Sequence, residues 1–325
     1  MTEPLRPMST GQLLDHTFAL YRKNFWLFVG IASLGPAANV VFQLFTVGSN
    51  VGSPFGASNR AATAAVMAKL GFTMLAGYLI MLAGMAISHA ATVKAVAAVH
   101  LGQQTSVSGA YKALRGRILS LFGTCGLILL WMALWMILAV IVMVAIMIPF
   151  SLFFRASSGA VGAVGPAAAV FAGLVAFTVI ALVFVGFIAV YVRYALAIQA
   201  CMVENLGPVA SLKRSVFLSK GSRWRVVVIY LIFLVLSLIL GFGLGGIAGG
   251  AGTLLHNKIA AAVLVYLAGF IAGSITGPLA TIGLSLLYYD ERVRKEAFDL
   301  QLMLSSLDVP GAPSATPEQA APAQI

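Results

Sequence analysis

The sequence predicts an all-α integral membrane protein with about six transmembrane helices and three short interfacial amphipathic helices. Composition is the first reason: 61% of the 325 residues are hydrophobic and 9% are charged, whereas soluble domains carry about 25% charged residues. Patterning is the second reason, because long uncharged runs alternate with short basic segments. A transmembrane helix needs about 20 mostly apolar residues, and several of these runs reach that length.

We expect one polytopic membrane domain over residues 10–303, with polar ends at 1–9 and 304–325 that lack a core-forming pattern and are predicted to be disordered. Two apolar runs, 118–154 without any charge and 166–202 with Arg193 near its end, are longer than one span needs. We predict a single long helix for each, because turn signals are missing from most of the first run; splitting both would give eight spans. The six predicted spans are 24–47, 70–92, 118–148, 166–192, 224–249 and 260–289.

Three basic amphipathic helices are predicted at the membrane interface, starting near Thr10, Ser106 and Pro208. Thr10 is suited to an N-cap and Pro208 to a first helical turn. Each helix is followed by a span, a connection and a returning span, so the pattern predicts three helical-hairpin repeats. Residues 48–68, rich in Gly, Ser and Asn, are predicted to be the first connecting loop, and Pro36 is expected to kink the first span.

Charge predicts the orientation. Segment 193–225 holds six Lys and Arg residues between two membrane-length runs, and such segments face the cytoplasm. With both termini cytoplasmic, sixteen of the twenty Lys and Arg residues fall on that side. We therefore expect a multi-pass protein of the bacterial cytoplasmic (inner) membrane, with no cleaved signal peptide and with anionic lipid at its basic face. A nucleic-acid partner is not expected, because the cations flank apolar runs.

Three segments resemble the bacterial family of glycerophosphoryl diester phosphodiesterase membrane domain proteins. They are GQLLDHTFALYRKNF (11–25), VENLGPVASLKRSVFLSKGSRWRV (203–226) and LLYYDERVRKEAFDL (286–300). The chain departs from the family pattern at Glu291, where an apolar residue is usual, and at Ala297, where glycine is common. In some relatives this region is fused to a phosphodiesterase domain, for which no polar segment here is long enough. The resemblance therefore implies a membrane module without the catalytic part.

Charged residues at the membrane boundaries are predicted to form one cytoplasmic cluster that ties the three units together. Glu204 is the only acidic residue between Asp15 and Asp290. A carboxylate near membrane depth is a functional candidate, but Glu204 lies beside a helix stop, which favours a structural pairing with a neighbouring cation. The predicted members of the cluster are Asp15, Arg22, Glu204, Lys213, Arg214, Asp290, Arg292 and Arg294.

Small and polar residues within the spans suggest helix packing. Glycines recur every fourth residue in spans five and six, and such faces let helices approach closely. We predict that these two spans pack along the ladders Gly241, Gly245, Gly249 and Gly269, Gly273, Gly277. Asn39 and Gln43 share a face of span one; we expect them to bond to another helix, and the alternative is the polar lining of a pathway.

No catalytic constellation is recognisable: the sequence has no acid pair inside a span, no Ser/His/Asp or Cys/His set and no phosphate loop. His and Cys spacing suggests no metal site, so we expect no enzyme, metal or cofactor. A membrane scaffold or anchor with a membrane or cytoplasmic protein partner is the first functional prediction, and a transporter or lipid-handling protein is the alternative. A cavity between the spans would favour the second class, and a closed bundle the first.

Overall fold

The computed structural model describes residues 8–48, 60–100, 102–157, 165–254 and 258–296. This part of the chain is all-helical and contains six helical segments long and apolar enough to cross a membrane, which confirms an all-α, multi-pass membrane fold. The helices are α1 Thr10–Lys23, α2 Phe25–Ala32, α3 Leu34–Gly48, α4 Arg60–His100, α5 Val107–Lys112, α6 Ile118–Ser157, α7 Gly165–Arg193, α8 Ala197–Val203, α9 Pro208–Ser219, α10 Arg223–Leu254 and α11 Lys258–Glu296.

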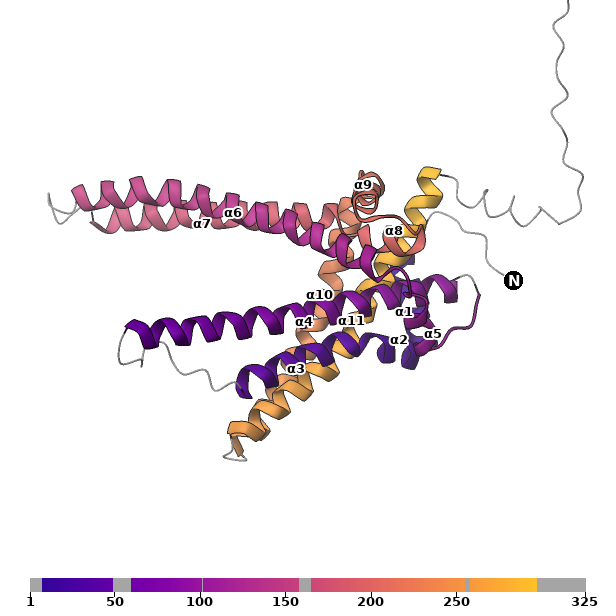
Figure 1. The fold of residues 1–325 in the computed structure, drawn as a ribbon. Coiled ribbons are helices and arrows are strands. Elements are labelled where there is room, and N and C mark those ends of the chain that lie inside the picture. The colour runs from indigo at the N-terminus through magenta and orange to yellow at the C-terminus, as the bar shows by residue number, and fades with distance from the viewer. Residues whose placement is uncertain (1–7, 49–59, 101, 158–164, 255–257, 297–325) are drawn as a thin grey trace, which may run out of the picture.

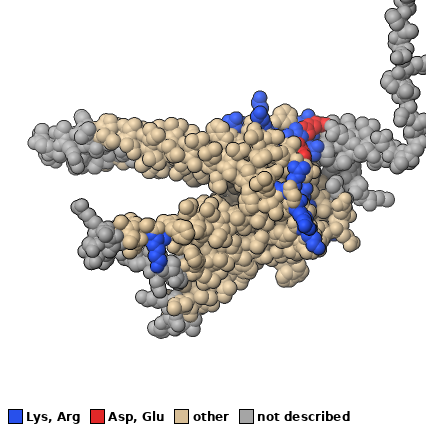
Figure 2. All heavy atoms as spheres, viewed as in Figure 1, with Lys and Arg blue, Asp and Glu red and all other residues tan. Residues whose placement is uncertain are grey.

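The long helices diverge from one end of the molecule (Figure 1). The short helices α1, α5, α8 and α9 gather at this end, which we call the charged end because most Lys and Arg side chains lie there, beside Asp and Glu (Figure 2). The helix pairs α3–α4, α6–α7 and α10–α11 extend away from it. Figure 2 also shows that the α6–α7 arm stands apart from the other arms over much of its length.

The buried core lies near the charged end. Its largest fully buried side chains come from α1, α2, α8 and α11, among other helices, and include Leu13, Phe28, Met202 and Tyr288. Along α6 and α7, in contrast, large apolar side chains are mostly exposed. In a membrane such a surface contacts lipid, which is as apolar as the side chains themselves.

The first span is broken at Ser33, between α2 and α3. Pro36 lacks the N–H that would bond to the carbonyl of Ala32. The hydroxyl of Ser88 on α4 donates to Ala32 O at 3.2 Å and to Ile31 O at 3.2 Å, and so satisfies carbonyls beside the break. The kink predicted at Pro36 is therefore a helix break that a neighbouring span caps.

Helix α11 contains Pro278 and runs without interruption to Glu296, well past the predicted end of the sixth span at residue 289. Near this proline the hydroxyl of Tyr21 on α1 donates to Ile275 O at 2.7 Å, which holds the interfacial helix α1 against α11. Burial raises the pKa of Tyr21 to about 12, so this phenol stays protonated as the donor.

Several local predictions need correction. Ser9, and not Thr10, caps α1, in a capping box with Gln12. Helix α4 begins at Arg60, so residues 60–68 are helical and not part of the predicted loop. The run 166–202 is divided, because α7 ends at Arg193 and α8 begins at Ala197, whereas the run 118–154 lies in one helix as predicted. The rest of the loop and both predicted disordered ends lie outside the described residues, except Met8 and Ser9, and the threefold repeat stays a prediction.

The prediction that the glycine ladders join spans five and six was wrong. A Cβ atom added to Gly273 would contact Pro36 of α3 at 3.0 Å and not α10. Helices α10 and α11 approach each other instead at Gly252, where a Cβ atom would lie 2.5 Å from the Cβ of Ala261, and at Gly283, which faces Ile229 at 3.1 Å. The ladder glycines whose added Cβ atom would meet nothing within 4 Å are Gly241, Gly245, Gly249, Gly269 and Gly277.

Candidate functional site

A first cluster of charges joins the start of α10 to the end of α11. We call it the Arg225 cluster: Arg225, Asp290, Glu291, Arg294 and the backbone of Met8. Arg225 Nη1 lies 2.6 Å from Asp290 Oδ2 and 2.9 Å from Glu291 Oε1, and Arg294 Nε lies 2.9 Å from the same Asp290 oxygen. The Asp290 side chain is 0% exposed. A buried carboxylate is tolerated only when it is paired and hydrogen-bonded, and these two guanidinium groups supply that pairing.

The same cluster holds the chain before α1. The Met8 N–H donates to Asp290 Oδ1 at 2.6 Å, and the Met8 carbonyl accepts from Arg225 Nη2 at 2.9 Å and from Arg294 Nη2 at 2.6 Å. Both carboxylate oxygens of Asp290 are therefore engaged, and the segment that leads into α1 is bound to the last span.

A second group, the Arg214 cluster, consists of Arg214, Glu204, Tyr288, Arg292 and Glu296. Arg214 Nε donates to Glu204 Oε1 at 2.9 Å. Arg214 also forms a bidentate ion pair with Glu296, in which Nη2 donates to Oε2 at 2.7 Å. The Tyr288 hydroxyl also donates to Glu204, and Arg292 Nε lies 3.3 Å from Glu296 Oε2. Hydrogen bonding to Glu296 and then to Glu204 raises the pKa of Arg214 above its ordinary value.

Lys295 connects α11 to α9. Its Nζ lies 3.1 Å from Glu291 Oε2 and donates to the carbonyls of Leu218 and Lys220, the latter at 2.8 Å. These carbonyls lie at the C-terminus of α9, where cations are stabilising because the last carbonyls of a helix lack partners. The two clusters thus lie on different sides of the last turns of α11, because Asp290 and Arg294 project away from Tyr288, Arg292 and Glu296 at 3.6 residues per turn. Together they fix α9, α10 and the N-terminal segment against this end of α11.

Five of the predicted cluster residues form ion pairs, but in two clusters and not in the single one predicted: Glu204, Arg214 and Arg292 in one, Asp290 and Arg294 in the other. Asp15, Arg22 and Lys213 belong to neither, because they are exposed and form no ion pair within the described part of the chain. The residues that sequence reasoning missed are Arg225, Glu291, Lys295 and Glu296. For Glu291, Lys295 and Glu296 a signal was present, because acids and bases recur at i,i+4 spacing along residues 290–296, which is typical of a helix. The sixth span was predicted to end before these residues.

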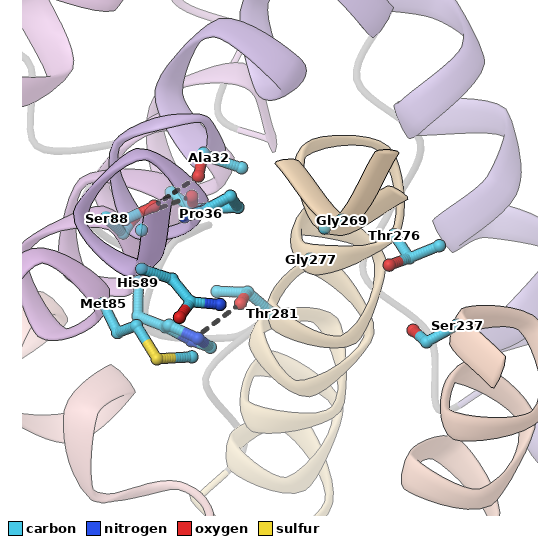
Figure 3. Close-up of a pocket in the computed structure, with 14 residues that line it drawn as sticks. Ala32, Pro36, Met85, Ser88, His89, Ser237, Gly269, Thr276, Gly277 and Thr281 are labelled. Carbon is cyan, nitrogen blue, oxygen red and sulfur yellow. Dashed lines mark hydrogen bonds between the residues drawn. The ribbon is translucent and has the colours of Figure 1, made fainter. Parts of the chain in front are cut away.

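A cavity of about 310 Å³ lies among the spans α3, α4, α10 and α11 (Figure 3). His89 of α4 reaches toward α11, where its Nδ1 lies 3.0 Å from Thr281 Oγ1. Ser237 of α10 lines the cavity from the other side. Most of the surface that lines the cavity is apolar, and its further polar residues include Asn39 and Thr276.

A second cavity of about 240 Å³ adjoins the first, since Asn39 and Gly269 line both. Gln43 lines the second cavity only. Asn39 makes no hydrogen bond to another described residue, which contradicts the expectation that it would bond to a neighbouring helix and agrees with the polar-lining alternative. Most of the ladder glycines line one or both of these cavities. They are Gly241, Gly245, Gly269, Gly273 and Gly277.

Within the described ranges, no group of three His, Cys, Asp or Glu side chains is arranged to hold a metal ion. No protein-family model, no curated protein and no solved structure matches this chain. The membrane fold, the ion-paired end and the cavity between the spans are therefore the observations from which a function can be inferred.

Proposed function

We propose that this protein is a non-catalytic membrane module that binds a lipid or another amphiphile between its spans. The observation that carries the proposal is the cavity of about 310 Å³ among α3, α4, α10 and α11. Sites for small molecules are concave, mostly apolar and lined by a few placed polar groups. A module that served only as a scaffold would need close helix packing at this position, and a cavity costs packing energy.

We also infer that the charged end faces the cytoplasm of a bacterial inner membrane, with both termini on that side. Of the five described acids, Glu204, Asp290, Glu291 and Glu296 are engaged in ion pairs, and Asp15 is exposed. The surface of this end is therefore strongly cationic, as the positive-inside rule requires, and suited to anionic lipid. The exposed cations of this end that lie outside the ion pairs are Arg22, Lys23, Lys112, Arg115, Arg193, Lys213, Lys220 and Arg223.

The resemblance to the glycerophosphoryl diester phosphodiesterase membrane domain supports the same class of function, a membrane module without a catalytic part. The Glu291 departure has a local explanation, because this carboxylate pairs with Arg225 and Lys295. A scaffold or anchor is the second candidate. It is favoured by the α6–α7 arm, whose exposed apolar surface, including Trp131 and Phe177, could be covered by a membrane partner.

The test is mass spectrometry of the protein purified in native lipid discs, comparing the wild type with two glycine variants. Gly269 lines both cavities, so Gly269→Leu should fill them, whereas Gly243 lies on α10 outside both linings and provides the control Gly243→Leu. An added Cβ atom meets nothing within 4 Å at either position, and a melting temperature measured for both variants would verify that each is folded.

We expect the wild type and Gly243→Leu to retain a lipid or solute well above its abundance in the bulk membrane. Retention by Gly269→Leu should fall by about tenfold, which corresponds to ~1.4 kcal/mol of binding free energy. A stoichiometric protein partner without any selectively retained lipid would overturn the proposal and favour the scaffold.

A further inference from the structure

Three polar groups that line the cavity have no hydrogen-bond partner among the described residues. His89 uses Nδ1 for its contact with Thr281, and no described residue hydrogen-bonds to its Nε2. The amide of Asn39 and the hydroxyl of Ser237 likewise have no partner among the described residues. Polar groups within a membrane normally find partners, because unsatisfied ones cost free energy. Three of them around one cavity indicate that a ligand supplies the missing hydrogen bonds.

The lining also limits the charge of that ligand. Among the described residues, the cavity lining contains no Asp, Glu, Lys or Arg. The nearest acidic residue along α11 is Asp290, nine residues after Thr281, which is about 14 Å along the helix axis at 1.5 Å per residue. A charged head group in this cavity would be buried without a counter-ion, which is costly. The ligand should therefore be uncharged at the point where it meets His89.

The histidine selects the kind of uncharged group. A neutral imidazole has one donor nitrogen and one acceptor nitrogen. If Thr281 donates to Nδ1, then Nε2 carries the proton and needs an acceptor; if Nδ1 donates to Thr281, then Nε2 needs a donor. A hydroxyl group satisfies either arrangement, since it can both donate and accept. An ester or ether oxygen can only accept, so it would suit one tautomer alone.

We propose that the cavity selects an uncharged amphiphile through a free hydroxyl group bound to His89 Nε2, with the Asn39 amide and the Ser237 hydroxyl as further contacts. This proposal rests on the proposed function and specifies its ligand class, of which diacylglycerols and long-chain alcohols are members. The adjoining cavity of about 240 Å³, which is lined in part by Val265 and Phe270, would receive the start of an acyl chain.

The test uses the full chain in detergent-solubilised form and a diacylglycerol that carries a photoactivatable group on one acyl chain. Cross-linking is measured against three unlabelled competitors: the parent diacylglycerol, its O-methyl ether and the phosphatidic acid with the same chains. We expect the diacylglycerol to compete at least tenfold better than the ether or the phosphatidic acid, a ratio that equals about 1.4 kcal/mol.

Variants of the cavity residues test whether His89 and Asn39 select the hydroxyl group. His89→Phe keeps a ring in place and removes both nitrogens, so it should lower cross-linking about tenfold and abolish the preference over the ether. Asn39→Leu, at an exposed position of α3, is a second variant with less effect on folding. Ser274→Ala is the matched control, because its hydroxyl is buried and unpaired on α11 but does not line the cavity; it should behave as the wild type.

The two proposals fail in different ways. If the ether or phosphatidic acid competes as well as diacylglycerol, or if folded His89→Phe and Asn39→Leu both keep the wild-type preference, the hydroxyl selection is wrong, although Gly269→Leu would still lose its lipid. If none of the lipids competes and Gly269→Leu retains the same lipids as the wild type, then the cavity is not a ligand site and the proposed function falls as well.

Discussion

The charged end and the α6–α7 arm are stabilised by different interactions. The helices at the charged end are held by buried aliphatic side chains, two ion-pair clusters and helix caps. These interactions determine which residues of different helices contact each other. Along the arm, large apolar side chains are exposed, and lipid can replace most of what they would contact. Within the arm, the ring of Trp135 on α6 covers Gly186 of α7. The comparison teaches that specific pairing is concentrated where polar groups are buried, since there an error in pairing is expensive.

The largest effect is expected for Arg225→Ala. The change would leave the buried carboxylates of Asp290 and Glu291 short of a partner, and breaking a buried ion pair typically costs about 3–5 kcal/mol. Thermal unfolding in detergent, followed by circular dichroism, would measure the loss. Arg223→Ala is the control, because Arg223 lies in the same first turn of α10, is exposed and forms no ion pair with a described residue. Equal losses for both variants would mean that the cluster does not hold the charged end together.

A direct comparison of the two regions uses the same substitution in each. Leu196 is fully buried at the charged end, and Leu138 on α6 is 51% exposed. Truncation of a buried leucine to alanine costs about 2–5 kcal/mol, because it leaves a cavity. We expect Leu196→Ala to lower the unfolding free energy by this amount and Leu138→Ala to change it by less than about 0.5 kcal/mol, as surface changes do. A large loss from Leu138→Ala would indicate that the arm packs against a partner, which would strengthen the scaffold alternative.

The smallest changes in stability are expected for glycine substitutions, and they distinguish glycines in helix contacts from glycines that line a cavity. At Gly252 a new methyl group would lie 2.5 Å from the Cβ of Ala261, so Gly252→Ala should destabilise the α10–α11 contact by about 1–3 kcal/mol through overpacking. At Gly245 the methyl group would meet nothing within 4 Å, so Gly245→Ala should be neutral or add up to about 1 kcal/mol of helix stability. Cysteine cross-linking between α10 and α11, measured together with the melting temperature, would show whether Gly245 has a packing role after all.

Sequence reasoning succeeded best where a structure depends on a short stretch of chain. The start of α9 at Pro208 and the single helix over residues 118–154 follow from local signals. It failed where a contact depends on two segments that are distant in the sequence. The ladder glycines were predicted to pack α10 on α11, but spacing does not say how each helix is rotated about its axis, and most of those glycines face cavities. Asp15 and Arg22 were placed in the cluster on charge alone, and α1 leaves them exposed.

The sequence by itself determined that the chain is an all-α, multi-pass membrane protein and approximately where its helices cross. That outcome is local, because each uncharged run must satisfy its backbone hydrogen bonds within itself once it leaves water. Only the tertiary structure decided that Arg225 meets Asp290 and Glu291, that Tyr21 meets α11 beside Pro278, and that His89 and Thr281 border a cavity. These pairings depend on how the helices cross and rotate, and those angles follow from the packing of the whole bundle.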